Sequence, residues 1–405
     1  MMRLLRNGFV TGPALGALWL VVLATSFAIA ASFATGAPFR PSILLSLIWG
    51  GVLGGAMLIR GLTPPLTGGL VAVGLGMLGA IGIGPVAADT GMMAAALVNA
   101  ATGLATGWSL AVILAPLPGH SKLTKHEFEE ALIRFLTGFG YIFFTAIVAI
   151  PFYVMVMTSL KNQSELIQNP LDFSIDLSRG WDLFRSYSEL FNDFNFGTYM
   201  VNSLLISVLT VFITLAFSIP GAYAVARLRF KGQALFSRSI LLIYMVPVIV
   251  LALPIYIAFS MTGLRNTIVG ILLIYPVTTI PVALYMLQGY FRGLPHEVEE
   301  AGLMDGLSRL AVIWKITLPL SLPAIASVSL YVFMIAWNEF LLAFMLLDDP
   351  TKFTLTRGIA SLNSSEIPRQ HLMAGAVVAT VPIMALFLGL ERFMTKGLTA
   401  GSVKG

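Results

Sequence analysis

The residue types that most often carry out chemistry are few in this chain, and they do not form a recognisable catalytic set. His126 and Glu127 begin like the His-Glu-x-x-His motif that binds zinc, but Glu130 stands where the second histidine should be. The sequence has no cysteine, no Gly-x-Ser-x-Gly turn and no phosphate-binding Gly-x4-Gly-Lys motif. We therefore expect no metal site, no nucleophilic catalysis and no cofactor in this chain.

The composition points to a membrane protein. Hydrophobic residues make up 57% of the chain and charged residues only 11%, whereas a soluble domain carries about 25% charged residues. Apolar stretches recur that are long enough to cross a hydrocarbon core about 30 Å thick. The net charge of +5 lies in the segments between them, so it does not indicate nucleic-acid binding. We predict an all-α integral membrane protein embedded in the lipid bilayer.

The apolar stretches predict about ten transmembrane helices. With both termini in the cytoplasm, the inner segments hold 16 lysines and arginines and the outer segments hold 8, of 24 in total. This bias favours that orientation. An alternative, in which the first stretch is a cleaved signal peptide, would leave an odd number of spans and weaken the bias. The expected spans are roughly 9–32, 41–59, 66–86, 92–115, 135–158, 198–226, 239–261, 267–290, 321–346 and 372–391.

A polar interruption near residues 120–130 predicts two membrane blocks. Residues 1–118 form an N-terminal four-helix extension, and residues 119–405 form a six-helix domain with a long external loop at 159–197. Small residues four apart let helices approach closely. We expect them to pack within this chain, although dimerisation stays open; they are Gly50/Gly54, Gly51/Gly55 and Gly103/Gly107.

The most informative segment is the loop 294–319, which the charge bias places in the cytoplasm. Pro295 can open a helix whose first turn is acidic. Gly306 breaks that helix, and Ser308 can cap a second one. Pro319 is then expected to end the second helix just before the next span. The product is a short, bent helix pair.

The bent pair carries much apolar surface for a loop, which indicates a docking site for another protein. Packing against the ends of this chain's own helices is the alternative. The apolar side chains are Ala301, Leu303, Leu307, Leu310, Ile313, Trp314 and Ile316.

This loop resembles the EAA loop of bacterial ABC-importer permeases, and we call residues 294–319 the EAA loop. Its Gly302 stands where that family often has alanine, a departure that should leave the helix less rigid. The resemblance implies that the loop couples the chain to a separate ATPase. The matching positions are Glu300, Ala301, Gly302, Asp305, Gly306, Ile316, Leu318 and Pro319.

Other segments are similar to the carbohydrate branch of that family, the maltose-type permeases. The similarity covers about residues 135–405 and not the first four spans. It rests on Asn202-Ser203-Leu204, on Ala222-Tyr223-Ala224-Val225-Ala226-Arg227 and on Trp337-Asn338-Glu339-Phe340.

The resemblance implies a transport subunit rather than an enzyme, in the bacterial inner membrane. Such a permease pairs with a sister permease, an ATPase dimer that binds ATP and Mg, and an extracytoplasmic solute-binding protein. Its expected cargo is a sugar, such as a small oligosaccharide or glycoside. The alternatives are an ion-coupled secondary carrier, or a permease of the same family for a non-sugar solute.

Glu339 is the one acidic residue that falls in the interior of a predicted span, since Glu391 stands at the very end of the last one. Ionisable groups at that depth are costly and often mark a substrate path. Trp337 and Asn338 could add a stacking face and hydrogen bonds for a sugar ring. These three residues are therefore the predicted translocation path. The alternative is that Glu339 pairs with a sister subunit or lies near the outer water and only shapes packing.

Overall fold

The computed structural model describes residues 6–59, 63–169, 172, 174–244, 246–364 and 367–399. Contacts between Cα atoms divide the chain into two compact units, Met1–Leu183 and Phe184–Gly405, which are described separately. This division follows how tightly helices pack, and it falls later in the chain than the boundary predicted at 118/119.

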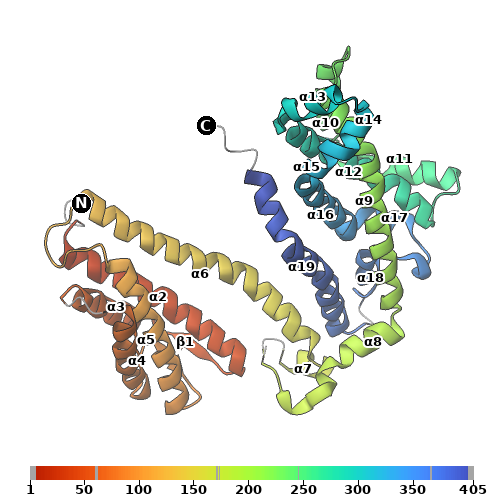
Figure 1. Ribbon diagram of the computed structural model, residues 1–405. Coiled ribbons are helices and arrows are strands. Elements are labelled where there is room, and N and C mark those ends of the chain that lie inside the picture. Colours follow the sequence, from red (N-terminus) through yellow and green to blue (C-terminus); the bar gives the residue numbers. More distant parts are fainter. Residues whose placement is uncertain are drawn as a thin grey trace. The chain divides into compact units, whose positions relative to one another are not determined.

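Unit 1 is built from long apolar helices. Strand β1 (Phe39–Pro41) pairs antiparallel with β2 (Val86–Ala88), and the buried Asn99 side chain exchanges hydrogen bonds with the backbone of Val86. The helices are α2 (Gly8–Thr35), α3 (Ile43–Met57), α4 (Pro64–Ala80), α5 (Met92–Leu114), α6 (Lys125–Ser159) and the short α7 (Gln163–Gln168) (Figure 1).

Glycines bring the backbones of α2 and α3 into direct contact. A Cβ on Gly16 would lie 2.3 Å from the carbonyl oxygen of Gly50, and one on Gly54 would lie 2.1 Å from that of Gly12. Gly103 of α5 meets α4 in the same way. The predicted pairs Gly50/Gly54 and Gly103/Gly107 therefore pack closely within the chain, whereas a Cβ on Gly51 or Gly55 would make only ordinary contact with Pro13.

Helix α6 packs on α2 and α5, because Trp19 fills the space between the three helices. The Trp19 side chain is buried, its ring lies edge-on to Phe135 at 5.6 Å, and its indole N–H donates to the Ser109 hydroxyl at 2.7 Å. The last predicted span before the external loop thus belongs to unit 1 by packing.

The segment after α6 is held by charged contacts. The Arg179 side chain is largely buried and lies 3.2 Å from both Glu165 and Asp182. Lys161 pairs with Asp172 at 3.1 Å. The segment includes the 3-10 helix η1 (Leu177–Phe184) and leads to α8 (Arg185–Asp193).

Unit 2 is organised around the parallel helices α9 (Phe196–Arg227) and α12 (Ile268–Gly293), which pack along their lengths. The hydroxyls of Thr214 and Thr279 meet across them at 2.7 Å. The other elements are α10 (Gln233–Tyr244), α11 (Val248–Met261), α13 (His296–Met304), α14 (Arg309–Val312), η2 (Ile313–Thr317), α15 (Leu318–Leu320), α16 (Leu322–Asn338), α17 (Leu341–Leu346), η3 (Pro350–Lys352), α18 (Leu355–Ser361) and α19 (Arg369–Thr399).

Two predicted spans are interrupted. The span at 239–261 is divided into α10 and α11, and Pro247 is the N-cap of α11. The break before Pro247 is expected, because a proline disfavours helical backbone at the residue that precedes it. The span at 321–346 is divided at Glu339, whose extended backbone separates α16 from α17.

In the described residues, six helices are long and apolar enough to cross a membrane, and a seventh span arises if the bent pair Arg309–Leu320 and Leu322–Asn338 counts as one. Three shorter apolar helices, α3, α4 and α11, overlap predicted spans. The mainly helical membrane fold is thus confirmed, whereas the count of ten spans and the division into four and six stay predictions.

Candidate functional site

The first arm of the EAA loop is α13, and it begins and ends where the sequence predicts. Pro295 precedes its first residue, and the helix ends at Met304. The backbone then turns through Gly306, whose φ of +82° is favourable only for glycine. The Leu307 N–H donates to the Gly302 carbonyl at 3.1 Å, which closes the turn.

The second arm also begins as predicted, but it ends differently. The Ser308 hydroxyl accepts the N–H of Ala311 at 3.3 Å and caps α14. A π-helical turn, η2, follows, in which the Leu318 N–H reaches back to the Ile313 carbonyl. This wider turn accommodates the ring of Pro319, which was expected to end the arm and instead lies within α15.

The helix actually breaks at Ser321. There the chain bends by 77° into α16. The arms α13 and α14 therefore stand at one end of unit 2, and α8 lies at the other end (Figure 1).

Gly302 lets the two arms pack closely. A Cβ at this position would lie 2.5 Å from Cδ1 of Ile316, which comes from the second arm. Gly302 is buried and Ile316 is half-buried. At Gly302, where the family often has alanine, the space that an alanine methyl would need is therefore occupied by the side chain of Ile316.

Glu299 anchors the loop, although the sequence pattern marked it only as one of several acidic residues at a helix start. It is buried, and its Oε1 lies 3.4 Å from Arg227 Nε and 3.0 Å from the Thr317 hydroxyl. The Tyr223 hydroxyl donates to Oε2 at 3.3 Å. Adjacent helical positions point about 100° apart, so the pair Glu299-Glu300 could have signalled one buried and one exposed carboxylate.

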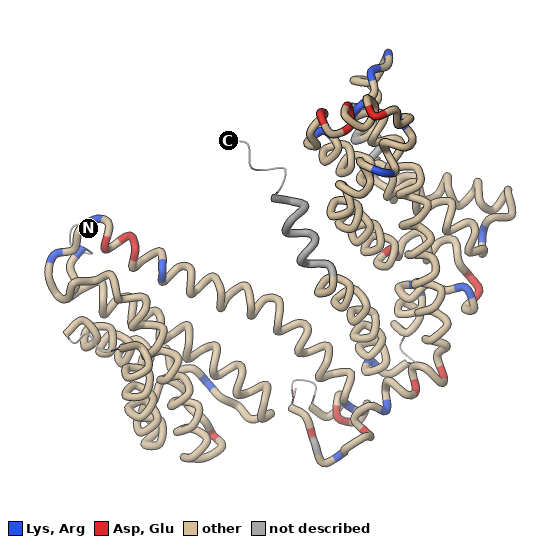
Figure 2. Tube along the Cα trace, viewed as in Figure 1, with Lys and Arg blue, Asp and Glu red and all other residues tan. Residues whose placement is uncertain are grey.

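The opposite face of the loop is exposed. Met304 is 87% exposed, Leu310 70% and Trp314 71%. Glu300, Ala301, Asp305 and Gly306 are also exposed, Leu318 is half-buried and Pro319 is exposed. Figure 2 shows that charged residues gather around α13 and α14 and are few along the long helices of unit 2. This end of unit 2 thus exposes apolar side chains that are surrounded by charged residues.

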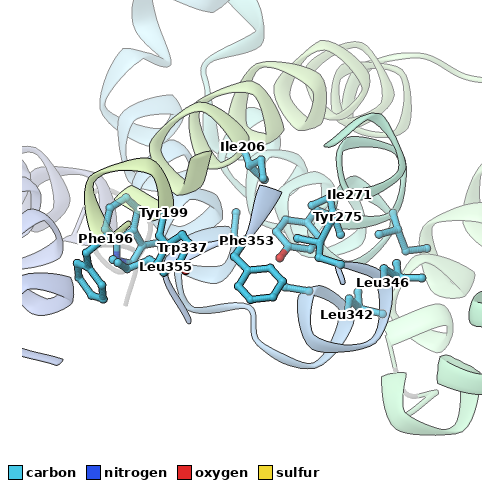
Figure 3. Packing of buried hydrophobic residues seen from close by; sticks show 14 of the residues in the cluster. Phe196, Tyr199, Ile206, Ile271, Tyr275, Trp337, Leu342, Leu346, Phe353 and Leu355 are labelled. Carbon is cyan, nitrogen blue, oxygen red and sulfur yellow. The ribbon is translucent and has the colours of Figure 1, made fainter. Parts of the chain in front are cut away.

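The three residues of the predicted translocation path lie together but differ in exposure. Trp337 is buried among Tyr199, Phe333 and Leu355, and its indole N–H donates to the Ala379 carbonyl at 3.1 Å (Figure 3). Asn338 is exposed, and its amide N–H donates to the Met334 carbonyl.

Glu339 connects the two halves of an interrupted helix. Its carboxylate oxygens accept the N–H groups of Leu342 at 2.8 Å and Ala343 at 3.1 Å, at the start of α17. Its backbone carbonyl accepts the Thr356 hydroxyl at 2.6 Å. In this conformation the side chain therefore stabilises the break between α16 and α17.

Comparisons with known proteins agree with these motifs. The family described as "binding-protein-dependent transport system inner membrane component" matches residues 218–399. The Escherichia coli K12 inner membrane ABC transporter permease protein YcjP is 38% identical over 269 residues, which cover 66% of this chain and 95% of that protein. The trehalose/maltose transport system permease protein MalG of Thermococcus litoralis is 33% identical and covers 68% of this chain and 99% of that protein.

Two further similarities extend this result. The trehalose transport system permease protein SugB of Mycobacterium tuberculosis is 36% identical over 55% of this chain and 82% of its own length. A solved bacterial ABC transporter that imports the acidic polysaccharide alginate shares the fold, with a TM-score of 0.56 and 22% identity over 65% of this chain and 97% of its own. This chain therefore belongs to the binding-protein-dependent inner membrane permeases of carbohydrate ABC importers, which are transport components rather than enzymes.

Proposed function

We propose that this chain is one of two permease subunits that carry a sugar across the bacterial inner membrane, and that its EAA loop couples it to a separate ATPase dimer. The observation that carries the coupling role is the exposed apolar face of Met304, Leu310 and Trp314 on a loop whose other face is firmly packed. Exposed anchors on a preorganised support are typical of docking surfaces.

The remaining parts of the importer follow from the family. The ATPase dimer binds ATP and Mg, a sister permease completes the path, and an extracytoplasmic solute-binding protein delivers the cargo. The charge bias supports a cytoplasmic EAA loop and cytoplasmic termini.

The cargo we propose is a small oligosaccharide or glycoside. Support comes from relatives named for trehalose and maltose, diacetylchitobiose, arabinooligosaccharides and sulfoquinovosyl glycerol. Within this chain, Asn338 is the exposed member of the predicted path. Trp337 and Glu339 would support that path, because their polar atoms already bind the backbone.

The coupling role is tested with Gly306→Val and Glu300→Lys, each purified with its partner subunits. Valine cannot readily adopt the left-handed turn, and lysine reverses an exposed charge. A lost interface contact of a few kcal/mol should reduce co-purifying ATPase about tenfold or more. Asp193→Lys, an exposed charge reversal at the last residue of α8, is the control. Normal ATPase recovery with both variants would remove the loop from the coupling mechanism.

The cargo is tested by measuring binding of the cognate receptor to trehalose, maltose, diacetylchitobiose and arabinooligosaccharides. Saturable binding of one of these sugars is expected. A receptor that ignores sugars and binds a different solute would support the alternative of a non-sugar permease.

A further inference from the structure

The cytoplasm-directed end of α9 is fixed to the EAA loop by one buried arginine. Only 2% of the Arg227 side chain is exposed. Its guanidinium donates to the Leu294 carbonyl at 2.7 Å and contacts Nδ1 of His296 at 2.7 Å. These contacts hold the residues on either side of Pro295, where α13 begins.

Glu299 extends this attachment to the second arm of the loop. The carboxylate faces Arg227 and Tyr223 of α9, and it also accepts the hydroxyl of Thr317 at the end of η2. A single buried carboxylate therefore joins α9, α13 and the π-helical turn. Neither Arg227 nor Glu299 contributes to the exposed face of the loop.

A pair of this kind makes a stiff connection. Two charges removed from water are stabilised only while their geometry is kept, and breaking one partner of a buried pair is strongly destabilising. The hydroxyls of Thr317 and Tyr223 hold the carboxylate further, because each donates to a different carboxylate oxygen, at 3.0 and 3.3 Å. A displacement of the loop should therefore be passed to α9 with little bending at the junction.

We propose that the Arg227–Glu299 pair is the joint through which movement of the EAA loop drives α9 during transport, so that both are positioning residues for the conformational cycle. This inference rests on the coupling role proposed above. The docking face and the joint consist of different residues. A variant can therefore lose the transfer of movement to α9 and still bind the ATPase.

The test uses spin labels, because the chain contains no cysteine and accepts them at chosen sites. Labels at the exposed positions Ala216 on α9 and Glu297 on α13 report how rigid the joint is. Labels at Ala216 and the exposed Met384 on α19 report movement of α9 when ATP and vanadate are added to the complete importer.

The main variant is Arg227→Met with Glu299→Gln, which removes both charges and leaves no lone buried charge. Arg227→Lys keeps the charge, shortens the side chain and serves if the double variant does not insert. Lys231→Met is the matched control, since it removes an exposed positive charge four residues further on.

We expect ATPase recovery to stay normal in the variant, while the Ala216–Glu297 distance distribution broadens. The nucleotide-driven change in the Ala216–Met384 distance should be largely lost. Wild-type distances for both pairs of labels would overturn the proposal that Arg227 and Glu299 form the joint. Loss of ATPase recovery would overturn it too, because the two residues would then only support docking. Failure of the loop as a docking element is detected separately, by Gly306→Val.

Discussion

Ser203 on α9 accepts the backbone N–H of Leu355 at 2.7 Å, at the first residue of α18. The neighbouring Asn202 donates to the carbonyls of Thr351 and Phe353 at 3.0 and 3.1 Å. The Asn-Ser motif of the carbohydrate permeases therefore has a structural task here. It fixes the segment before α18 to the N-terminal half of α9.

Ser203→Ala should destabilise unit 2, because Leu355 is fully buried and its N–H would lose its partner. The expected cost is about 1–3 kcal/mol, measured as a lower midpoint of thermal unfolding in detergent. Ser329→Ala is the control, since that hydroxyl only returns to a carbonyl of its own helix. Equal midpoints for the two variants would contradict the prediction.

Gly16→Ala should destabilise unit 1 by about 1–3 kcal/mol, as overpacking does. The added methyl would strike backbone atoms of Gly50 and Gly54, which cannot rotate away. Gly69→Ala is the matched control on α4, where a Cβ meets nothing within 4 Å. Limited proteolysis of the two variants in detergent should show faster cleavage only for Gly16→Ala.

Acid should weaken the contact between α8 and α19. A hydrogen bond from Arg185, and a smaller contribution from His371, hold the pKa of Glu189 below its ordinary value of 4.5. A carboxyl group whose pKa is lower in the folded state than in the unfolded state stabilises the fold at pH values above its unfolded pKa. This stabilisation is lost as the pH falls through the pKa of the folded state. The thermal midpoint of the wild type should therefore fall more steeply below about pH 4.5 than that of Glu189→Gln. Parallel pH profiles would show that the contact contributes nothing.

The orientation predicts the activity of a reporter that works only outside the cytoplasm. Fusions after Asn192 should be active, whereas fusions after Lys125, Ser237 and Arg309 should be silent. The reason is the excess of basic residues on the inner segments. Activity at Ser237 would reverse the orientation, because this residue lies within the stretch 227–238, which holds four basic residues and no acidic one.

Much of the EAA loop could be predicted because its determinants are local. Pro295, Gly306 and Ser308 act through their own backbone preferences, and each has the predicted role. Pro319 was misjudged because a π-helical turn, which has no sequence signature, removes the conflict with its ring.

The burial of Glu299 and Trp337 could not be predicted with the same certainty, since it depends on partners far away in the sequence. Arg227 lies 72 positions before Glu299, and Ala379 lies 42 positions after Trp337. The same limit applies to the interrupted span near Pro247, where proline signals only that a break is possible. Hydropathy located the apolar helices, but it does not reveal such pairings.

The contact between α2 and α3 constrains how this chain can evolve. Gly12 and Gly16 meet Gly54 and Gly50, and a Cβ on any of the four would lie within 3 Å of an atom of the other helix. A clash between side chains is commonly relieved when the opposite residue becomes smaller, but a glycine has nothing left to remove. No exchange across this interface can therefore compensate for a substitution, and the four positions can change only if the two helices separate.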